Sequence, residues 1–392
     1  MLDLKALPDG FHDDPFPHYA RLRSQAPACA QPDGSVLLTR HADLVAIYRD
    51  TARFLSDKKP VFGPKYGTGS PLYRHHTTSL VFNDPPLHTR VRAIMTGAMA
   101  PRALTRLEPG LIALVDRLLD RLETLEAPDL IEDFAAAIPV EVIGNLLAIP
   151  HTARAPLRDW SLAILGALEP ALAPEAQARG DRAVTDFTAL LDDLVADRRR
   201  HPGDPETDVL TRLIQGDLTA EELIQNCIFI LNAGHETTTN LIGNALALLE
   251  AHRDVRAALL ADPSLLPGAV EEVLRLESSN QFGNRLTAEP LTLHGLDIPP
   301  GTDLHLCIGA ANRDPDAFDA PDTFDPTRRP NRHLAFGGGP HVCVGLTLAR
   351  MEGTIALSRF LARFPDYALR PGSVRSRRIR FRGFTRLPAR LR

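Results

Sequence analysis

Hydrophobic residues recur along most of the chain with the three-to-four-residue spacing of an amphipathic helix. Such a stretch follows Asp14 and Pro15, which suit a helix N-terminus, and residues 41–50 repeat the pattern. Prolines divide a longer series of helix-like segments between residues 86 and 263. Near its end, Thr219 and Glu222 form a capping-box pattern, which predicts one very long helix over residues 219–250.

Three segments depart from this helical spacing. Residues 35–39 and the short runs within 285–308, which a His-Gly pair interrupts at 294–295, are typical of strands. Residues 57–80 are rich in Gly, Pro, Tyr and His, and we expect a long loop there. No repeat or low-complexity linker divides the sequence. The pattern therefore predicts a mainly α fold with a small β portion, in a single domain over residues 1–392.

Composition narrows the class of protein. The chain has 392 residues, of which 44% are hydrophobic and 24% charged, as in a globular protein large enough to enclose a big cofactor. Its net charge of −5 argues against nucleic-acid binding. No run of eighteen apolar residues and no secretory signal occur, so we expect a cytoplasmic protein without a membrane span.

Two further features concern cysteine and arginine. Cys29, Cys227, Cys307 and Cys343 are far apart and form no CxxC pair, so neither a zinc site nor a disulfide framework is indicated. Cysteines that stay as thiols fit a reducing cytosol. Residues 361–392 hold ten arginines and one acidic residue, Asp366. For this segment we favour exposed strand faces over a site for an anionic partner.

The most informative stretch is 336–345, Phe-Gly-Gly-Gly-Pro-His-Val-Cys-Val-Gly. Its cysteine, Cys343, directly precedes the helix-patterned segment 346–361, and the field of a helix N-terminus favours a thiolate. The glycines let the backbone turn sharply and approach a flat partner. A single rigidly held thiolate suits the axial position of haem iron. The alternative is a buried cysteine in a glycine-rich turn.

A second motif, Ala233-Gly234-His235-Glu236-Thr237-Thr238, lies within the long predicted helix. Glycine and threonine are poor helix formers, and the hydroxyl of Thr237 can bond back to the carbonyl of Ala233 and loosen the helix. A small ligand or water could occupy the resulting groove. Glu236 could pass protons there and Thr237 could hold them in place. The alternative is a solvated polar patch on an ordinary helix.

Together these stretches resemble the cytochrome P450 family. The loop matches Phe-Gly-x-Gly-x-His-x-Cys-x-Gly at all its fixed positions, and the helix matches (Ala/Gly)-Gly-x-(Asp/Glu)-Thr. Glu272-Val-Leu-Arg275 matches the family's Glu-x-x-Arg pair, and residues 311–326 resemble the stretch between its sheet and its haem loop. The resemblance extends from about residue 14 to the C-terminus.

The resemblance implies a triangular, mainly helical prism with a long central helix over haem b. Cys343 is then the iron ligand, while Glu236 and Thr237 deliver protons for cleavage of the O–O bond. Glu272 and Arg275 maintain the fold. Further cofactor-binding residues implied by the motif positions are Ala233, Gly234, Phe336 and Gly345, with His88, Arg92, Arg285 and His341 as partners of the haem propionates. His333 is a weaker candidate.

The implied activity is that of a bacterial monooxygenase, which inserts one atom of O2 into a small or medium hydrophobic substrate. Because the haem domain accounts for all 392 residues, we expect electrons from a separate ferredoxin and ferredoxin reductase, and a monomeric protein. Arg102, Arg106, Arg350 and the arginine-rich C-terminus are candidates for a basic ferredoxin-binding face.

The substrate itself is not indicated. Candidate walls of the substrate pocket are residues 57–80, Phe229, Asn232 and residues 281–283. His75 and His76, or Lys58 and Lys59, could bind a carboxylate, but we favour solvated loop residues.

Three other functions stay open. A peroxide-driven peroxygenase typically lacks the acid–threonine pair, so Glu236 and Thr237 argue against it. A non-catalytic haem sensor would need no proton relay. A helical interaction protein without a cofactor would give a colourless purified chain.

Overall fold

The computed structural model describes residues 2–99, 101–205 and 208–391, with the side chains of all of these except residues 98 and 101–103. The side chain of Arg102 therefore lies outside the described residues. By internal packing the chain forms two compact units. The first comprises Met1–Leu55, Ile112–Ala135 and Thr237–Arg392, and the second comprises Ser56–Leu111 and Ala136–Glu236. The single domain over 1–392 stays a prediction.

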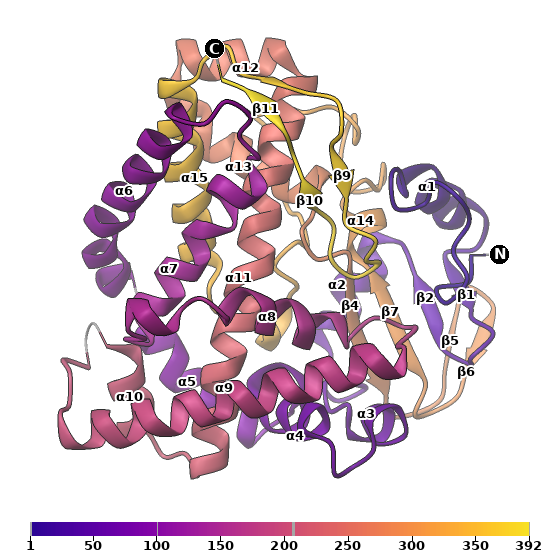
Figure 1. Cartoon of the computed structure of the whole chain (residues 1–392). Helices are drawn as coiled ribbons and strands as arrows, with labels where there is room; N and C mark the ends of the chain where they lie inside the picture. Colours follow the sequence, from indigo (N-terminus) through magenta and orange to yellow (C-terminus); the bar gives the residue numbers. More distant parts are fainter. Residues whose placement is uncertain (1, 100, 206–207, 392) are drawn as a thin grey trace. The chain divides into compact units, whose positions relative to one another are not determined.

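Helices make up most of both units (Figure 1). Two of them, α6 (Pro101–Glu123) and α11 (Ala220–Ala251), run from one unit into the other. The helices of the first unit are α1 (Phe16–Gln25), α2 (His41–Arg49), η2 (Ile131–Ala135), α12 (Arg253–Ala261), η4 (Pro263–Leu265), α13 (Leu266–Leu276), α14 (Ile308–Ala311), η5 (Gly339–His341) and α15 (Leu346–Arg363). Those of the second are α3 (Lys59–Tyr66), α4 (Pro71–Thr78), η1 (Leu80–Phe82), α5 (Leu87–Ala98), α7 (Ala137–Leu146), η3 (His151–Ala153), α8 (Leu157–Gly166), α9 (Pro174–Arg200) and α10 (Val209–Gln215).

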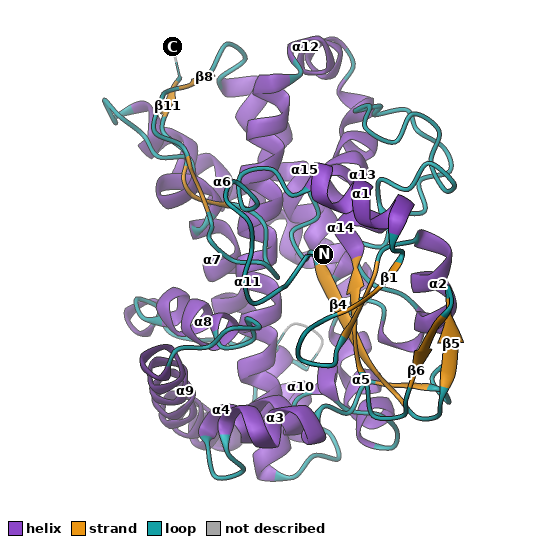
Figure 2. Ribbon diagram, turned by 90° about the vertical axis from the view of Figure 1, so that its right-hand side faces the viewer, coloured by secondary structure: helices purple, strands orange, loops and turns teal. Residues whose placement is uncertain are grey.

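The strands of the first unit form one larger sheet and three small pairs (Figure 2). The five-stranded sheet has the order β1 (Ala28–Ala30), β2 (Val36–Leu38), β7 (Asp303–Cys307), β4 (Phe282–Thr287) and β3 (Phe54–Leu55). The pairs are β5 (Leu291–Leu293) with β6 (Leu296–Ile298), β8 (Ala368–Leu369) with β11 (Ala389–Arg390), and β9 (Val374–Arg375) with β10 (Phe384–Arg386). The prediction of a mainly α fold with a small β portion is thus confirmed.

The five-stranded sheet packs against α2. Its strand β2 runs parallel to β7, and β4 lies antiparallel to β7 with Arg285 opposite Leu304. Leu38, Leu44 and Leu304 are fully buried between the sheet and α2, so this apolar contact fixes α2 against β2 and β7. The predicted His-Gly turn is confirmed, because His294 and Gly295 have φ values of 51° and 78° and join β5 to β6.

The long helix α11 begins where the capping box places it. The backbone N–H of Glu222 donates to Thr219 Oγ1 over 3.2 Å, and the N–H of Thr219 donates to Glu222 Oε2 over 2.8 Å. These reciprocal bonds satisfy two donors that a helix start leaves without intrahelical partners. No helix in the described part of the chain is both long and apolar enough to cross a membrane.

The prediction of a long loop over residues 57–80 is wrong, because α3, α4 and η1 occupy most of that segment. Pro71 is the first residue of α4, and the hydroxyl of Ser70 caps it by accepting a bond from the N–H of Tyr73. Phe62, Tyr66 and His76 pack their rings against one another. Their burial stabilises helices that the Gly and Pro content disfavours.

The interpretation of the C-terminal arginines as exposed strand residues is also wrong for two of them. Arg382 is buried and donates from Nε to Glu277 Oε2 over 2.7 Å, and Nη1 of Arg375 lies 3.3 Å from the same oxygen. Burial raises the pKa of Glu277, but the charges of Arg382 and Arg375 outweigh it, so the pKa is lowered. These arginines therefore serve as internal partners that compensate the buried charge of Glu277.

Candidate functional site

Cys343 differs from the other three cysteines in its exposure. All four are among the described residues; Cys29, Cys227 and Cys307 are buried, and Cys343 is exposed. Its backbone N–H donates to the carbonyl of Phe336 over 2.9 Å and so closes the loop 336–343. The 18-residue helix α15 begins at Leu346. The thiol is thus accessible and lies just before a helix N-terminus, where the thiolate is favoured.

Two glycines allow the shape of this loop. Gly337 and Gly339 have φ values of +68° and +63°, in the left-handed region that side chains disfavour. A Cβ on Gly339 would also lie 1.9 Å from the carbonyl oxygen of Tyr48. Only glycine therefore lets the loop rest against the last turn of α2, and this contact holds the loop in place.

Tyr48 connects the thiolate loop to strand β4. A Cβ on Gly283 would lie 2.1 Å from the Tyr48 hydroxyl, and the guanidinium of Arg285 lies over the Tyr48 ring, 5.1 Å from its centroid. Burial raises the pKa of Tyr48 to about 12, against the opposing charge of Arg285. No motif in the sequence identified Tyr48, because its contacts with Gly339, Gly283 and Arg285 join distant segments.

Arg285, one of the predicted propionate partners, is buried in the first unit. Its Nη1 donates to the carbonyl of Asn284 over 2.7 Å, and it is 6% exposed. His341, another predicted partner, is half-buried within η5. A buried cation of this kind suits an anionic group, because burying a carboxylate requires cations and hydrogen-bond donors beside it.

His88 and Arg92 lie in the second unit, both on α5 and one turn apart. His88 is buried and Arg92 is half-buried, and their four-residue spacing puts them on one face of the helix. Joint binding of one cofactor by this pair and by the residues of the first unit stays a prediction.

A second layer of charge supports the loop from α13 and α15. Arg350 donates from Nε and Nη2 to the two oxygens of Glu271 over 2.7 and 2.8 Å, and its guanidinium lies 4.8 Å from the centre of the Phe336 ring. The bonds to Glu271, and then the charge of Cys343, raise the pKa of Arg350. A permanent cation therefore lies in the electrostatic field of the thiol and favours the thiolate.

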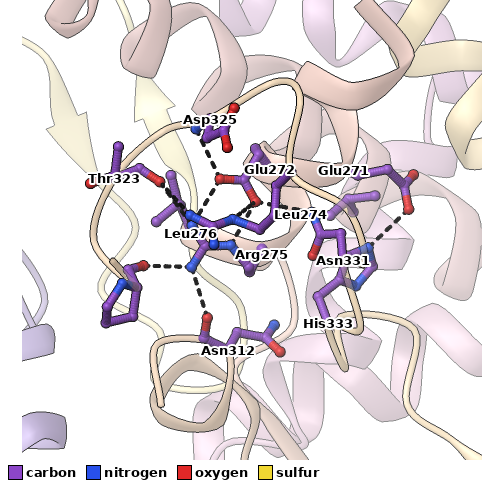
Figure 3. A network of polar contacts seen from close by, with 12 residues as sticks. Glu271, Glu272, Leu274, Arg275, Leu276, Asn312, Thr323, Asp325, Asn331 and His333 are labelled. Carbon is purple, nitrogen blue, oxygen red and sulfur yellow. Dashed lines mark hydrogen bonds and ion pairs between the residues drawn. The ribbon is translucent and has the colours of Figure 1, made fainter. Parts of the chain in front are cut away.

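His333 belongs to the same layer. Its Nε2 lies 3.2 Å from Glu271 Oε2, and its side chain is 3% exposed (Figure 3). This contact gives His333 a structural partner other than the propionate for which it was a weaker candidate. The sequence offered no signal for the Glu271–Arg350 pair, whose members are 79 positions apart.

The Glu272–Arg275 pair is buried and forms a network (Figure 3). Arg275 also donates to the carbonyls of Asn312 and Thr323, each over 3.0 Å. Glu272 in turn accepts bonds from the N–H of Asp325 and from the Asn331 amide, over 3.0 and 2.9 Å. The pair thus fixes the irregular segment that leads to the thiolate loop, as its predicted structural role requires.

The motif of α11 has one accessible face within an otherwise buried stretch. Phe229, Gly234 and Thr237 are half-buried and Ala233 is exposed, whereas Asn232, His235 and Glu236 are buried. Phe229, Ala233 and Thr237 are spaced by four residues, so they lie along one line of the helix. We call these three residues the open face of α11. The helix continues through the motif without a break, so the predicted loosening does not interrupt it.

Gly234 has a packing role on another side of α11. A Cβ there would lie 2.8 Å from Cδ1 of Ile143, which belongs to α7. The absence of a side chain therefore lets α7 approach α11 closely. Its predicted contact with a cofactor stays a prediction.

The residues present fit a thiolate-ligated haem. The first unit offers an exposed thiol on a rigid loop and a buried guanidinium for an anionic group. The open face of α11 consists of small and apolar side chains with one hydroxyl, which suits contact with a flat ring and a small polar ligand.

Comparisons with known proteins agree with this chemistry. The family described as Cytochrome P450 matches residues 168–388. Cytochrome P450 107B1 of Saccharopolyspora erythraea is 37% identical over 99% of this chain and 98% of its own length. Vitamin D(3) 25-hydroxylase of Pseudonocardia autotrophica is 37% identical over 96% of this chain and 94% of its own length.

Among solved structures, P450BioI in complex with hexadec-9Z-enoic acid ligated acyl carrier protein superposes with a TM-score of 0.93. The two sequences are 33% identical, and the superposition covers 98% of this chain and 100% of that one.

Proposed function

This chain belongs to the cytochrome P450 family and is a monooxygenase with haem b as its cofactor. On that premise we propose that the thiolate of Cys343 would hold the haem iron. The main support for this proposal is the exposure of Cys343, because a metal can reach an exposed thiol and the other three cysteines are buried. Its loop is closed by the bond to Phe336 and rests on Tyr48, so the sulfur is held in one place. The cation of Arg350 and the start of α15 favour its thiolate form.

The bound group would supply reductive activation of O2, with the thiolate favouring O–O cleavage. The proposed task of the protein is to bring protons to the reacting oxygen. Thr237 lies on the open face of α11 and offers its hydroxyl as a hydrogen-bonding group there. Glu236, the preceding residue, is 5% exposed, and we assign to its carboxylate the transfer of protons to that hydroxyl.

We assign the remaining predicted residues to binding of the cofactor. Arg285 and His341 in the first unit, and His88 and Arg92 in the second, would neutralise the propionates, because each is a cation or hydrogen-bond donor with restricted exposure. Phe336, Gly345 and Ala233 would contact the ring, since each presents an apolar or minimal side chain. Gly234 would do so through its backbone, because the side of Gly234 that lacks a Cβ faces Ile143.

The substrate that we propose is a small or medium hydrophobic molecule, and the electron donor a ferredoxin with its reductase. Arg350, seven positions after Cys343, supports a cationic docking face only through its 38% exposed side chain, because its guanidinium is paired with Glu271. The C-terminal arginines support it less than the sequence suggested, because Arg375 and Arg382 form ion pairs with Glu277.

The absorption spectrum of the dithionite-reduced protein under carbon monoxide tests the thiolate assignment. We expect the wild type to show a Soret band shifted far to the red, as thiolate ligation requires. Cys343→Ser should lose that band, and the control Cys29→Ala, which changes a buried thiol, should keep it. A red-shifted band in Cys343→Ser, or its absence from the haem-loaded wild type, would contradict the assignment.

Product formation tests the electron donor. We expect turnover with NAD(P)H, a ferredoxin and its reductase, and loss of product when the ferredoxin is omitted. Hydrogen peroxide alone should give much less product, because Glu236 and Thr237 are suited to O2 activation. Equal product from peroxide alone would instead indicate the peroxygenase, and stable O2 binding without any product would indicate the sensor.

A further inference from the structure

Three uncharged side chains of the second unit form a line from α4 to α11. Nδ1 of His75 lies 3.1 Å from Gln225 Oε1, and Nδ2 of Asn232 lies 3.3 Å from His75 Nε2. His75 and Asn232 are each 2% exposed, and Gln225 is 4% exposed. We call these three residues the amide–histidine line. Its members come from segments about 150 positions apart, so the sequence could not show it.

Burial keeps His75 neutral, and the line fixes which of its two ring nitrogens carries the proton. Burial lowers the pKa of His75 to about 4, against the bond to Gln225, so the ring is neutral at physiological pH. A neutral imidazole has one donor and one acceptor nitrogen. Nδ1–H donates to the Gln225 oxygen, and Nε2 accepts from the Asn232 amide.

The fixed ring in turn fixes the amide of Asn232. With Nδ2 directed at His75, the oxygen Oδ1 points away from the line. That oxygen is buried, yet it accepts no hydrogen bond from any described residue. A buried acceptor without a donor costs free energy, and a ligand that supplies the donor recovers it.

Asn232 borders the open face of α11. It lies one turn after Phe229, directly before the exposed Ala233, and one turn before Glu236. A molecule that packs against Phe229 and Ala233 would therefore meet Asn232 at its edge. The proposed proton donor follows at the next turn, so such a molecule would lie beside the proposed chemistry.

We propose that Asn232 determines substrate specificity, and that its Oδ1 accepts a hydrogen bond from a hydroxyl group of an otherwise apolar substrate. His75 is a positioning residue, which keeps the oxygen rather than the nitrogen of the amide directed at the substrate. The proposal rests on the proposed function, because it requires a substrate along the open face.

Retention of matched ligands in equilibrium dialysis tests the proposal on the haem-loaded protein. The probes are dodecanol, cyclododecanol and androstanol, each offered with its own methyl ether, and cyclododecanone as a ligand that can only accept. We expect at least one alcohol to bind about ten-fold more tightly than its ether, which is the gain from one hydrogen bond to a buried acceptor.

Three variants locate the cause. Asn232→Val should bring the alcohol-to-ether ratio to about one, because valine has no acceptor. His75→Phe should let the amide turn, so that cyclododecanone is retained about as well as cyclododecanol. The control Phe229→Leu changes the apolar wall and should alter the affinities for alcohol and ether by the same factor.

The proposal is overturned if no alcohol is retained better than its ether by the wild type, or if the preference survives Asn232→Val. Preferential retention of cyclododecanone by the wild type also overturns it, since Nδ2 would then face the ligand as a donor. The carbon monoxide spectrum of each sample reports the thiolate-ligated haem separately. A missing alcohol preference with a normal spectrum therefore rejects this inference and leaves the proposed function standing.

Discussion

Arg275 and Glu272 lie three positions apart on one face of α13, and neither side chain has any exposed surface. Nε of Arg275 lies 2.6 Å from Glu272 Oε1, and Nη2 lies 2.8 Å from Oε2, so both oxygens are engaged. In this geometry, removing one partner leaves the other charge buried without compensation. Breaking a buried ion pair in this way costs about 3–5 kcal/mol.

We therefore expect Glu272→Ala to unfold at a lower urea concentration and to retain little haem. The matched control is Asp50→Ala, which removes a pair with Arg53 at the same three-residue spacing, but one in which Arg53 is 52% exposed. That change should cost much less stability, because an ion pair in solvent gains little. Equal midpoints and equal haem content for the two variants would remove the structural role assigned to the buried pair.

The adjacent Glu271 makes stability depend on pH. Burial alone would raise its pKa, but the bonds from Arg350 and His333 lower it to about 2. In the unfolded chain the pKa of a glutamate is about 4.3. Glu271 therefore contributes its full stabilisation of the folded state above that pH, and this contribution is lost as the pH falls through its folded-state pKa of about 2. We expect a contribution of about 2 kcal/mol at neutral pH.

Urea unfolding of the wild type and Glu271→Gln between about pH 6 and pH 3 measures this contribution. The free energy of unfolding should fall towards acid more steeply in the wild type. If the two proteins lose stability in parallel, the acid sensitivity comes from other carboxyl groups.

Contacts between residues three positions apart on one helix could be predicted from the sequence. Thr219 and Glu222 are three positions apart and form the reciprocal bonds that their types predict. Glu272 and Arg275 likewise meet on one turn of one helix. For such pairs the spacing alone decides the contact, because a helix brings positions three and four apart together.

Contacts between distant segments were not predictable in this way. Residues 57–80 looked like a loop because nothing within them showed that Phe62, Tyr66 and His76 would pack together. The interpretation of His75 and His76 as solvated is wrong for the same reason, since both are buried. Lys58 is buried as well, and it too had been expected in solvent.

Glu352 gives the opposite pH dependence to Glu271. It lies on α15, where Thr238 Oγ1 donates to its Oε2 over 3.4 Å, and its Oε1 has no bonding partner among the described residues. Burial, only partly offset by Thr238, raises the pKa of Glu352 to about 8. The unfolded carboxyl ionises from about pH 4 upwards while the folded one stays protonated, so stability falls as the pH rises towards 8.

Glu352→Gln should therefore stabilise the protein by about 2 kcal/mol at pH 7 to 8 and have little effect near pH 4. The control Glu108→Gln changes an exposed carboxylate on α6 and should have no such dependence. Thermal unfolding at both pH values measures the effect. Destabilisation by Glu352→Gln at pH 8 would show that the buried carboxyl is ionised and paired instead.

Thr237→Ala should separate electron use from product formation. If the hydroxyl on the open face of α11 holds protons at the reacting oxygen, its loss should release more peroxide per NAD(P)H consumed. Thr237→Ser retains a hydroxyl and should stay close to the wild type. The ratio of peroxide to product decides the matter, and unchanged coupling in Thr237→Ala would mean that Glu236 or water suffices for the relay.

The contact between Gly339 and Tyr48 gives the last prediction. Gly339→Ala places a Cβ at a φ of +63° and against the carbonyl oxygen of Tyr48, 1.9 Å away. The backbone strain alone costs about 1 kcal/mol. The overlap adds a displacement of the loop that carries Cys343, because a backbone carbonyl in a packed helix end cannot retreat far.

Gly295→Ala isolates the strain, since Gly295 has a φ of +78° and a Cβ there would meet no atom within 4 Å. Both variants should lose about 1 kcal/mol of stability from strain. Only Gly339→Ala should weaken the red-shifted carbon monoxide band and lower haem retention, because only its loop must leave α2. If both variants keep the band at full intensity, the Tyr48 contact does not position the thiolate, and the loop must be held by the Phe336 carbonyl and α15 alone.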